Sequence, residues 1–369
     1  MYSRYFGQRV CENVNNTSCR KNCLLLYLAD PFRSGKNDRS HQNIFQSWEM
    51  VKVIGEFGYN VDVINFYDRN VALNKRYDMV VDIHPGFNRV YEKALHASCV
   101  KIAYMTGPNP NFTNKSELSR LDELYKRKGV RLKQRRYAMP LDKNEIESFD
   151  AVIMMSNEHN FKTYDEFMFK RVFLIKNTAY SFLKGDDFSS KNSSSFLFLA
   201  SLGQVHRGLD LLLEVFSRNQ QLNLFVCSPF KHERDFCKLY KKELFHSKNI
   251  SPIGFLDIEG KKFRDVVSTC AYVVLPSCSE GIAGSVLTAM SAGVIPIVSM
   301  ECGLEEDEVQ HFTSCKMEDI ERTLLYYSGM PIEWVRMETL RVMNMTHSRY
   351  SESKYAESIR NSFASILQD

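Results

Sequence analysis

Short apolar runs alternate along the chain with longer segments whose apolar residues recur at helical spacing. The short runs are rich in β-branched and aromatic residues, and this alternation predicts βαβ units with parallel sheets. In the first half, helices are expected at about His41–Phe57, with Ser40 as the N-cap, and across Ser116–Arg136. Strands are expected at Leu24–Leu28, Val61–Ile64, Met79–Ile83, Lys101–Tyr104, Ala151–Met155 and Val172–Ile175.

A polar, serine-rich segment, Ser181–Ser195, interrupts this pattern and is expected to be a linker. A second βα series follows. Its strands are expected at Phe196–Ala200, Leu222–Cys227, Tyr272–Leu275 and Ile295–Val298, and its helices at Leu209–Arg218, Glu233–Phe245, Lys261–Cys270, Met317–Tyr327, Pro331–Thr346 and Ser351–Leu367. The pattern predicts an α/β protein with two doubly wound, Rossmann-like domains over residues 1–180 and 196–346, joined by a linker over 181–195. A terminal helix in 347–369 is expected to cross back to the first domain. Ligands are expected in a cleft between the carboxyl ends of the two sheets.

Composition narrows the picture. A chain of 369 residues is long enough for two domains, and a net charge of only +4 gives no reason to expect a nucleic-acid partner. No apolar run approaches the roughly 20 residues that span a bilayer, and Met1–Asn22 lacks the apolar core of a signal peptide. The ten cysteines are scattered without a CxxC pair, which favours reduced thiols. A cytoplasmic protein is expected.

The most informative segment follows the predicted strand that ends at Leu275. Its sequence PSCSEGIAG carries Glu280 and two glycines, and a helix is expected to begin near Gly284 and to run through Met290. Free N–H groups at a helix start bind anions, and glycines let a phosphate approach the backbone. Glu280 stands just before this point, where its carboxylate can accept hydrogen bonds from a sugar attached to that phosphate.

This segment, the helix after it and the following AGVIPIVS (Ala292–Ser299) resemble the donor-site motif of GT-B glycosyltransferases, in particular the retaining family 4, also called glycosyl transferases group 1. A second segment, GQVHRGLD from Gly203 to Asp210, is similar to the family's diphosphate loop. Arg207 takes the position of that loop's lysine and can grip two phosphate oxygens.

The resemblance implies a GT-B fold and transfer of a glycosyl group from a nucleoside diphosphate sugar to a hydroxyl of a glycan, glycolipid or lipid-linked acceptor. It also implies retention of the anomeric configuration and no metal, and the chain contains no D-x-D triplet. The catalytic candidates are Glu280 and His84. The donor-binding candidates are Gly203, His206, Arg207, Ser279, Gly281, Ile282, Ala283, Gly284, Ser285 and Thr288. No cofactor is expected besides the nucleotide sugar.

Two positions depart from the family pattern. Thr288 stands where many members have a second glutamate that binds the ribose, and Leu202 stands where many have an arginine. Ribose recognition and phosphate neutralisation are therefore expected to be built differently, with more weight on His206 and Arg207. The departures also motivate an alternative, a catalytically weak nucleotide-sugar-binding subunit of a glycosylation complex. A GT-B sugar-nucleotide epimerase is a third reading.

Candidates in the first domain come from position rather than from a motif. His84 follows the strand Met79–Ile83, at a carboxyl end that faces the expected cleft. The loop Thr106–Asn109 ends the next central strand and is a second candidate for the lining of the cleft. The loop Pro31–His41 precedes a helix start and is either a solvated surface loop or an anion or acceptor loop, with the residues Arg33, Gly35, Lys36, Asn37 and Arg39. The strongly basic stretch Tyr125–Arg136 is either a solvated surface or a contact for anionic lipid headgroups, which would place the protein at the membrane periphery.

Overall fold

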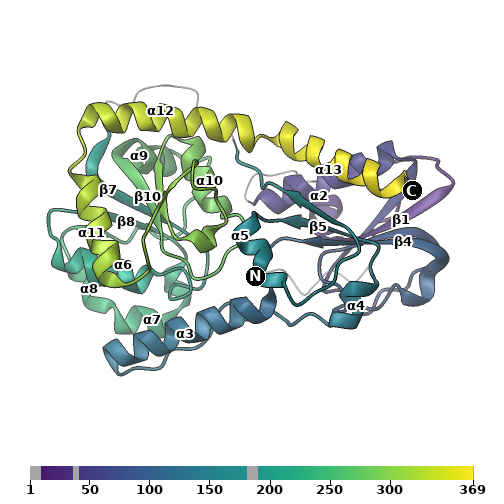
Figure 1. The fold of residues 1–369 in the computed structure, drawn as a ribbon, viewed down its shortest axis with the longest axis horizontal. Coiled ribbons are helices and arrows are strands. Elements are labelled where there is room, and N and C mark those ends of the chain that lie inside the picture. Colours follow the sequence, from purple (N-terminus) through teal and green to yellow (C-terminus); the bar gives the residue numbers. More distant parts are fainter. Residues whose placement is uncertain (1–9, 36–40, 181–189, 369) are drawn as a thin grey trace.

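The computed structural model describes residues 10–35, 41–180 and 190–368. Two six-stranded parallel sheets, each flanked by helices, lie side by side along the molecule (Figure 1). Every neighbouring strand pair in both sheets is parallel, because each strand returns to its sheet through a helical or irregular crossover. The α/β class, the two sheets and their parallel sense are as the sequence predicts.

The first sheet has the strand order β2-β1-β3-β4-β5-β6. Its strands are β1 (Lys21–Tyr27), β2 (Tyr59–Asn65), β3 (Tyr77–Asp82), β4 (Leu95–Met105), β5 (Ala151–Met155) and β6 (Val172–Ile175). All six predicted strands exist, and β5 and β6 have the predicted bounds. The others extend by several residues into polar ends, because strand pairing continues beyond the apolar run that marks the buried part.

The second sheet has the order β12-β11-β10-β7-β8-β9. Its strands are β7 (Asn192–Leu199), β8 (Asn223–Cys227), β9 (Ile250–Ser251), β10 (Cys270–Leu275), β11 (Ile295–Val298) and β12 (Gln310–His311). Strand β7 begins at Asn192, inside the segment expected to be a linker. Most of that linker, residues 181–189, lies outside the described residues.

Helices cover the faces of the two sheets. They are α1 (Asp30–Ser34), α2 (Gln42–Glu56), α3 (Pro110–Lys128), α4 (Lys143–Ser148), α5 (Glu158–Phe161), α6 (Leu209–Arg218), α7 (Arg234–Leu239), α8 (Lys241–His246), α9 (Lys261–Thr269), α10 (Gly284–Ser291), α11 (Met317–Ser328), α12 (Ile332–Arg349) and α13 (Glu352–Leu367). The 3-10 turns are η1 (Glu92–Ala94), η2 (Lys162–Tyr164), η3 (Phe230–His232) and η4 (Met300–Cys302).

Three helix predictions need correction. The helix expected over Ser116–Arg136 is α3, which begins at Pro110 and ends at Lys128, because Gly129 takes the left-handed conformation that closes a helix. The single helix expected over Glu233–Phe245 is two short helices, α7 and α8. The N-cap of α2 is His41, whose ring accepts a hydrogen bond from the Asn43 amide, and Ser40 lies outside the described residues.

The last helix packs on the first domain. Helices α12 and α13 run in succession along the same side of the molecule in Figure 1, and α13 ends over the first sheet. The Tyr355 hydroxyl lies 3.0 Å from that of Tyr104, Phe363 stacks on Phe57 with ring centroids 6.2 Å apart, and Arg360 pairs with Glu56. These contacts tie the end of the chain to strand β4 and helix α2.

Each sheet contains one point where the strand order reverses. In the first sheet β1 and β3 are neighbours, and in the second sheet β7 and β10 are neighbours. The chain departs in opposite directions from such a pair, so the loops that follow its two strands separate and leave room for a ligand. The loops after β7 and β10 contain the two segments that the sequence analysis identified as a donor site, one with Arg207 and the other with Glu280.

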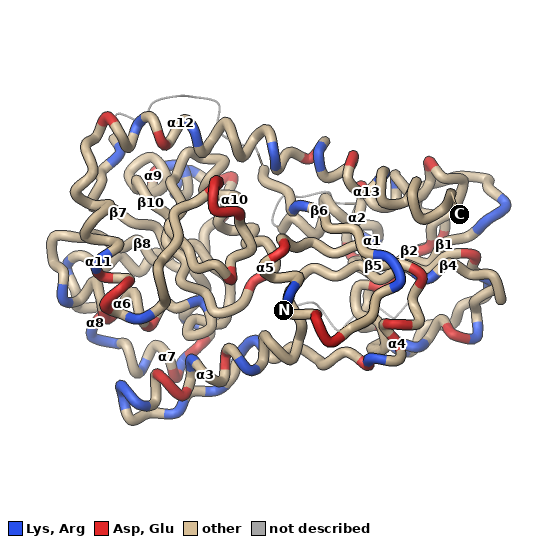
Figure 2. Tube along the Cα trace, viewed as in Figure 1, with Lys and Arg blue, Asp and Glu red and all other residues tan. Residues whose placement is uncertain are grey.

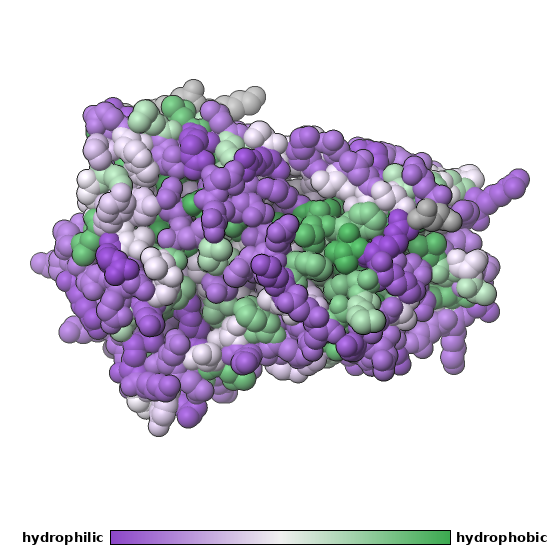
Figure 3. Space-filling view, in the orientation of Figure 1, coloured by the Kyte–Doolittle hydropathy of each residue, from purple (hydrophilic) through white to green (hydrophobic). Residues whose placement is uncertain are grey.

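The surface carries few further clues. In the orientation of Figure 1 the exposed face is largely hydrophilic, with apolar side chains gathered over the first domain (Figure 3). Within the described ranges, no helix has both the length and the apolar character needed to cross a bilayer. All ten cysteines are free thiols.

Candidate functional site

Hydrogen bonds of the backbone and of side chains join the loop after β7 to the loop after β10. The backbone N–H of Cys278 donates to the carbonyl of His206 at 2.9 Å, and the Ser277 hydroxyl donates to the same carbonyl at 3.4 Å. In the other direction, Nε2 of His206 lies 2.6 Å from the carbonyl oxygen of Ser279. The two predicted donor-site segments therefore form one continuous surface at the carboxyl edge of the second sheet.

An ion pair between Arg207 and Glu280 lies at the centre of this surface. Nη1 of Arg207 is 2.5 Å from Oε1 of Glu280, and both side chains are about nine-tenths buried, with exposed fractions of 8% and 10%. The other side of the guanidinium is held by Ser201, whose Oγ accepts from Nη2 at 3.0 Å, and by the carbonyl of Leu202. These bonds use three of the five N–H groups of Arg207, so two remain for a further acceptor.

The carboxylate of Glu280 is held through one oxygen. Its Oε1 accepts from Arg207 and, at 2.8 Å, from the Ser277 hydroxyl, whereas Oε2 has no partner among the described residues. Burial acts to raise the pKa of Glu280, but the neighbouring cations, Arg207 foremost, outweigh it and hold the pKa below its ordinary value. Glu280 is therefore a fixed, ionised carboxylate with one oxygen available to a ligand.

Helix α10 begins beside this carboxylate without a side-chain cap. Ala283 is its N-cap, and the first hydrogen bond within the helix runs from the Leu287 N–H to the Ala283 carbonyl. The N–H groups of Gly284, Ser285 and Val286 thus have no carbonyl partner within the helix. Together with the helix dipole, they give this point the partial positive charge that the sequence predicts for an anion site.

His206 links the two loops as a neutral ring. A carbonyl can only accept a hydrogen bond, so the contact with Ser279 requires a proton on Nε2, while Nδ1 is buried without a partner. Burial lowers the pKa of His206, which favours this neutral form. His206 therefore positions the Glu280 loop here and adds no cation, although the sequence analysis expected it to help bind the diphosphate.

Gly203 and Thr288, two of the predicted donor contacts, already have partners. The Gly203 N–H donates to the carboxylate of Glu233 at 2.6 Å, and this carboxylate also accepts from the N–H of Gln204. Thr288 is buried, donates to the Gly284 carbonyl at 2.9 Å and accepts from Gln42 at 3.2 Å. A ribose contact through Thr288 stays a prediction and would require the Gln42 side chain to move.

Ser279, Gly281 and Ile282, three further predicted donor residues, lie against the first domain. Side-chain amides of the first domain bind the carbonyls of the Glu280 loop: Asn160 reaches Glu280 and Gly281 at 2.9 and 2.8 Å, and Asn177 reaches Ile282 at 2.8 Å. The hydroxyl of Thr113 lies 2.8 Å from that of Ser279. A Cβ on Gly281 would collide with the Thr106 carbonyl, so only glycine lets the loops Thr106–Asn109 and 279–283 approach this closely.

Sequence reasoning missed these first-domain contributors. Gln42, Thr113, Asn160 and Asn177 come from four separate segments, and each is a common polar residue in an ordinary loop or helix end. Arg120 was also missed: it is buried in α3 and donates to the Pro276 carbonyl at 3.0 Å. No spacing rule connects these positions, because only the fold brings them to the second domain.

His84 lies where the sequence analysis placed it, at the carboxyl end of β3. Its backbone N–H donates to Asp82 at 2.8 Å, its ring stacks on Phe87, and burial lowers its pKa. Asp82 is fully buried beneath it and also accepts from the Tyr91 hydroxyl at 2.9 Å; burial raises the pKa of Asp82 to about 7. The geometry thus fixes the His84 backbone and shows no contact between His84 and the Glu280 loop among the described residues.

The loop after β1 is only partly described. Arg33, one of its predicted anion contacts, forms an ion pair with Asp68 at 3.2 Å. Lys36, Asn37 and Arg39 lie outside the described residues. The pKa of His41, at the end of this loop, is lowered, first by desolvation and then by the charges of Arg136 and Arg207. Gln42, the next residue, donates to the Gly284 carbonyl at 3.0 Å, so the end of this loop lies against the start of α10.

The basic stretch Tyr125–Arg136 contacts the second domain. Arg127 reaches Asp210 at 2.5 Å and Glu214 at 3.3 Å, and Lys128 lies 3.6 Å from Glu214. Figure 2 shows charges of both signs along α3 and the neighbouring helices. The sequence analysis offered a solvated surface or a lipid contact for this stretch, and the structure gives part of it a third role, as a strap between the domains.

A family model described as Glycosyl transferases group 1 matches residues 193–323. This match covers the two loops around Arg207 and Glu280 and about a third of the chain. No curated protein matches the chain.

Solved structures match almost the whole chain. Sucrose-phosphate synthase from Thermosynechococcus elongatus superposes with a TM-score of 0.68 at 13% identity, covering 95% of this chain and 100% of that one. HepE from Anabaena, in complex with UDP and glucose, has a TM-score of 0.59 at 10% identity and covers 94% and 100%. TarM from S. aureus has a TM-score of 0.57 at 13% identity over 79% and 55%.

The fold is GT-B. Both sheets, their parallel strands and the facing carboxyl ends agree with these structures, and the predicted fold class is confirmed. At identities this low, the structural matches establish the fold and leave the reaction to the geometry of the site.

Proposed function

We propose that this protein is a glycosyltransferase that moves a sugar from a nucleoside diphosphate sugar to a hydroxyl of a glycan or lipid-linked acceptor. The observation that carries the proposal is the arrangement of Glu280. Its Oε1 is held by Arg207 and Ser277, its Oε2 is left for a sugar hydroxyl, and the uncapped start of α10 lies directly after it. A carboxylate beside an anion site suits a sugar attached to a phosphate.

The proposed chemistry is stabilisation of the leaving group. As the glycosidic bond breaks, negative charge grows on the diphosphate, and preorganised N–H donors and a guanidinium stabilise that charge. The first turn of α10 and the two unused N–H groups of Arg207 supply these donors. Glu280 positions the sugar and is not required to act as a base.

Retention of the anomeric configuration and independence from metal belong to this proposal, and they rest on the motif resemblance. The match of residues 193–323 to the group 1 family supports the transferase class. The HepE structures, which contain UDP with glucose or UDP-glucose, support a nucleotide sugar as the donor. Product analysis by NMR would settle the anomeric outcome, and activity after treatment with EDTA would settle the metal requirement.

The test is a panel of UDP-, GDP-, ADP- and CMP-sugars. Thermal shift identifies the donor, because a ligand that binds only the folded state raises the melting temperature. Incubation with the radiolabelled form of that donor then shows whether nucleoside diphosphate is released, by transfer or by slow hydrolysis. Binding and release for one donor support the proposal. Binding without release for any donor favours the alternative, a nucleotide-sugar-binding partner subunit, and interconversion of two UDP-sugars without an acceptor favours an epimerase.

A further inference from the structure

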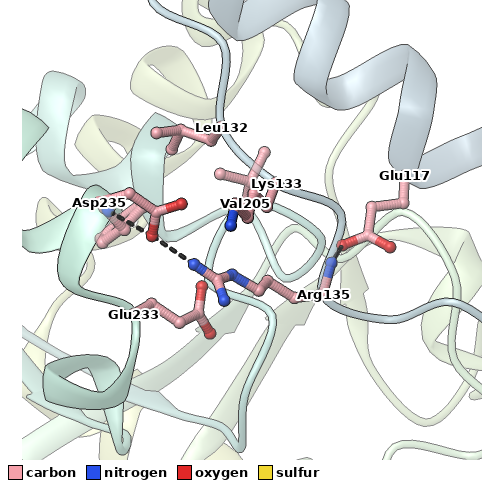
Figure 4. Close-up of a pocket in the computed structure, with 8 residues that line it drawn as sticks. Glu117, Leu132, Lys133, Arg135, Val205, Glu233 and Asp235 are labelled. Carbon is pink, nitrogen blue, oxygen red and sulfur yellow. Dashed lines mark hydrogen bonds and ion pairs between the residues drawn. The ribbon is translucent and has the colours of Figure 1, made fainter.

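The segment after α3 leaves the first domain and lies on the diphosphate loop of the second. Figure 4 shows Leu132, Lys133 and Arg135 of this segment against Val205, Glu233 and Asp235. Arg135 is anchored to Asp235 at 2.5 Å, and the cavity between the two segments is only about 10 Å³, room for about one water. Residues of this segment are therefore held close to the loop that carries Arg207.

Arg136 is fixed on this segment at two points. Its backbone N–H donates to the buried carboxylate of Glu117, at 2.9 Å from Oε2, and the same carboxylate accepts from the N–H of Arg135. Its side-chain stem covers Gly203: a Cβ added to that glycine would lie 2.5 Å from Cγ of Arg136. The stem of Arg136 thus packs on the bare backbone at the start of the diphosphate loop.

The charged end of Arg136 has no partner of its own. Its guanidinium makes no hydrogen bond or ion pair within the described part of the chain, and the residue is accessible to solvent. The stem of Arg136 contacts Gly203, whose carbonyl accepts the backbone N–H of Arg207 at 2.9 Å, so both arginines belong to the same turn of this loop surface. The pKa of Arg136 is lowered, first by desolvation and then by the charge of Arg207. The charges of the same two arginines also act to lower the pKa of His41, after desolvation.

The charges at this point are not fully paired. Two carboxylates act on Arg136: Glu280, which is already paired with Arg207, and Glu117, which already accepts the backbone N–H groups of Arg135 and Arg136. Neither forms an ion pair with the Arg136 guanidinium within the described residues. Like charges brought together in a surrounded site repel each other unless an anion binds between them. A guanidinium offers five N–H donors in a planar array that suits phosphate oxygens. The position next to Gly203 in the second domain, Leu202, supplies no charge, so a second cation there must come from the first domain.

We propose that Arg136 binds a phosphate of the donor diphosphate together with Arg207, from the opposite side of the domain contact. This inference rests on the proposed function and adds a residue that the motif does not contain. It also gives the nucleotide a structural effect: a diphosphate held by Arg207 of one domain and Arg136 of the other draws the two domains together.

The experiment compares Arg136→Gln with wild type. Glutamine retains Cγ and Cδ, so it still covers Gly203 while removing the charge. Arg131→Gln is the control on the same segment, because Arg131 is exposed and pairs with the exposed Asp122. Dissociation constants are measured by calorimetry for UDP, GDP and ADP and for the matching nucleosides. Arg136→Gln is expected to weaken binding of the preferred diphosphate about 10- to 100-fold and to leave nucleoside binding and the Arg131→Gln control at wild-type values.

The outcomes separate this inference from the proposed function. If wild type binds a nucleoside diphosphate and Arg136→Gln binds it equally well, the inference is wrong and the proposed function stands. That same result, combined with a raised KM for a phosphorylated acceptor, would assign Arg136 to the acceptor's phosphate. If wild type binds none of the three diphosphates, both ideas fail. Arg136→Lys retains one charge, and partial recovery of diphosphate binding in it supports a charge contact over a packing defect.

Discussion

The two sides of the candidate site are built differently. On the second domain, two loops that follow neighbouring strands are tied together by His206, Ser277 and the Arg207–Glu280 ion pair, all within one sheet edge. On the first domain, single side chains from separate segments reach across, among them Gln42, Asn160 and Asn177. The first arrangement is complete within one domain, whereas the second exists only when the domains are in contact.

This difference assigns different tasks to the two sides. A network closed within one domain holds its groups in place before a ligand arrives, which is what stabilisation of a leaving group requires. Contacts made across the domains depend on closure, which excludes water and commits the bound donor. Changes on the second-domain side should therefore act on chemistry or donor affinity. Changes on the first-domain side should act on closure, stability or acceptor use, except at Arg136, whose proposed contact is with the donor diphosphate.

The largest effect is expected from Glu280→Gln. The amide retains a hydrogen-bonding group for Ser277 but removes the charge that pairs with Arg207 and accepts from the sugar. We expect turnover of the donor to fall about 10²- to 10³-fold, as for loss of one preorganised catalytic contact. Binding of the free nucleoside diphosphate should change much less. Steady-state kinetics and calorimetry check this, with Glu301→Gln as the control. Equal losses of donor turnover and of diphosphate binding would indicate that Glu280 acts on the diphosphate through Arg207 and not on the sugar.

Removal of the strap should cost stability. In Arg127→Ala the buried carboxylate of Asp210 loses its partner, and burial already raises the pKa of Asp210 to about 6. We expect the free energy of unfolding at pH 7.5 to fall by about 3 kcal/mol. Chemical denaturation followed by circular dichroism measures it, and Lys126→Ala, on the exposed side of α3, should change little. If the free energy of unfolding falls as little in Arg127→Ala as in Lys126→Ala, the contact between Arg127 and Asp210 does not stabilise the protein.

Asp82 should make stability depend on pH. Its pKa is raised to about 7 by burial, whereas an unfolded aspartate titrates near 3.9, so the folded state binds more protons between these values. Its contribution to stability is therefore full below the unfolded pKa and is lost as the pH rises through 7. Between pH 5 and pH 7, Asp82 should lower the free energy of unfolding by about 2 kcal/mol, and Asp82→Asn should abolish this part of the pH dependence. Urea titrations at several pH values test this, and Asp165→Asn should retain the wild-type slope.

His84→Ala should have the smallest effect. The ring lies at the switch point of the first sheet and contacts Phe87, and no contact with the Glu280 loop is made in the described structure. We expect kcat/KM to fall about 10-fold in His84→Ala, which is the effect of losing one orienting hydrogen bond to the donor sugar or the acceptor. Affinity for the nucleoside diphosphate should not change. Unchanged kinetics would remove His84 from the site and leave it as a packing residue beside Phe87.

The fold, and the two second-domain segments that the structure brings into contact, could be predicted from the sequence for a physical reason. Apolar runs mark buried strands such as β5 and β11. Each of the Arg207 and Glu280 segments is one continuous stretch of sequence, so the order and spacing of its residues reveal it. The first-domain side could not be found this way. Arg136 packs on the diphosphate loop at Gly203, whereas Asn160 and Asn177 bind the Glu280 loop, and only tertiary structure brings these distant residues to the second domain.

Two sequence interpretations stay predictions, and the structure shows other contacts for the same residues. His206 was expected to help bind the diphosphate; in the structure a backbone carbonyl holds its Nε2, and burial lowers its pKa. The basic stretch Tyr125–Arg136 was considered for lipid contact from its charge alone. Its partners, Asp210, Glu214 and Asp235, lie about a hundred residues away, where no local pattern connects them to it.

The central claim is that Arg207 and the start of α10 hold the diphosphate of a nucleotide sugar. Calorimetric titration of the preferred nucleoside diphosphate into Arg207→Ala, with Arg218→Ala as the exposed control on α6, tests it most directly. The account predicts that affinity falls about 100-fold or more in Arg207→Ala and stays at the wild-type value in Arg218→Ala. An unchanged dissociation constant in a folded Arg207→Ala would contradict the diphosphate assignment.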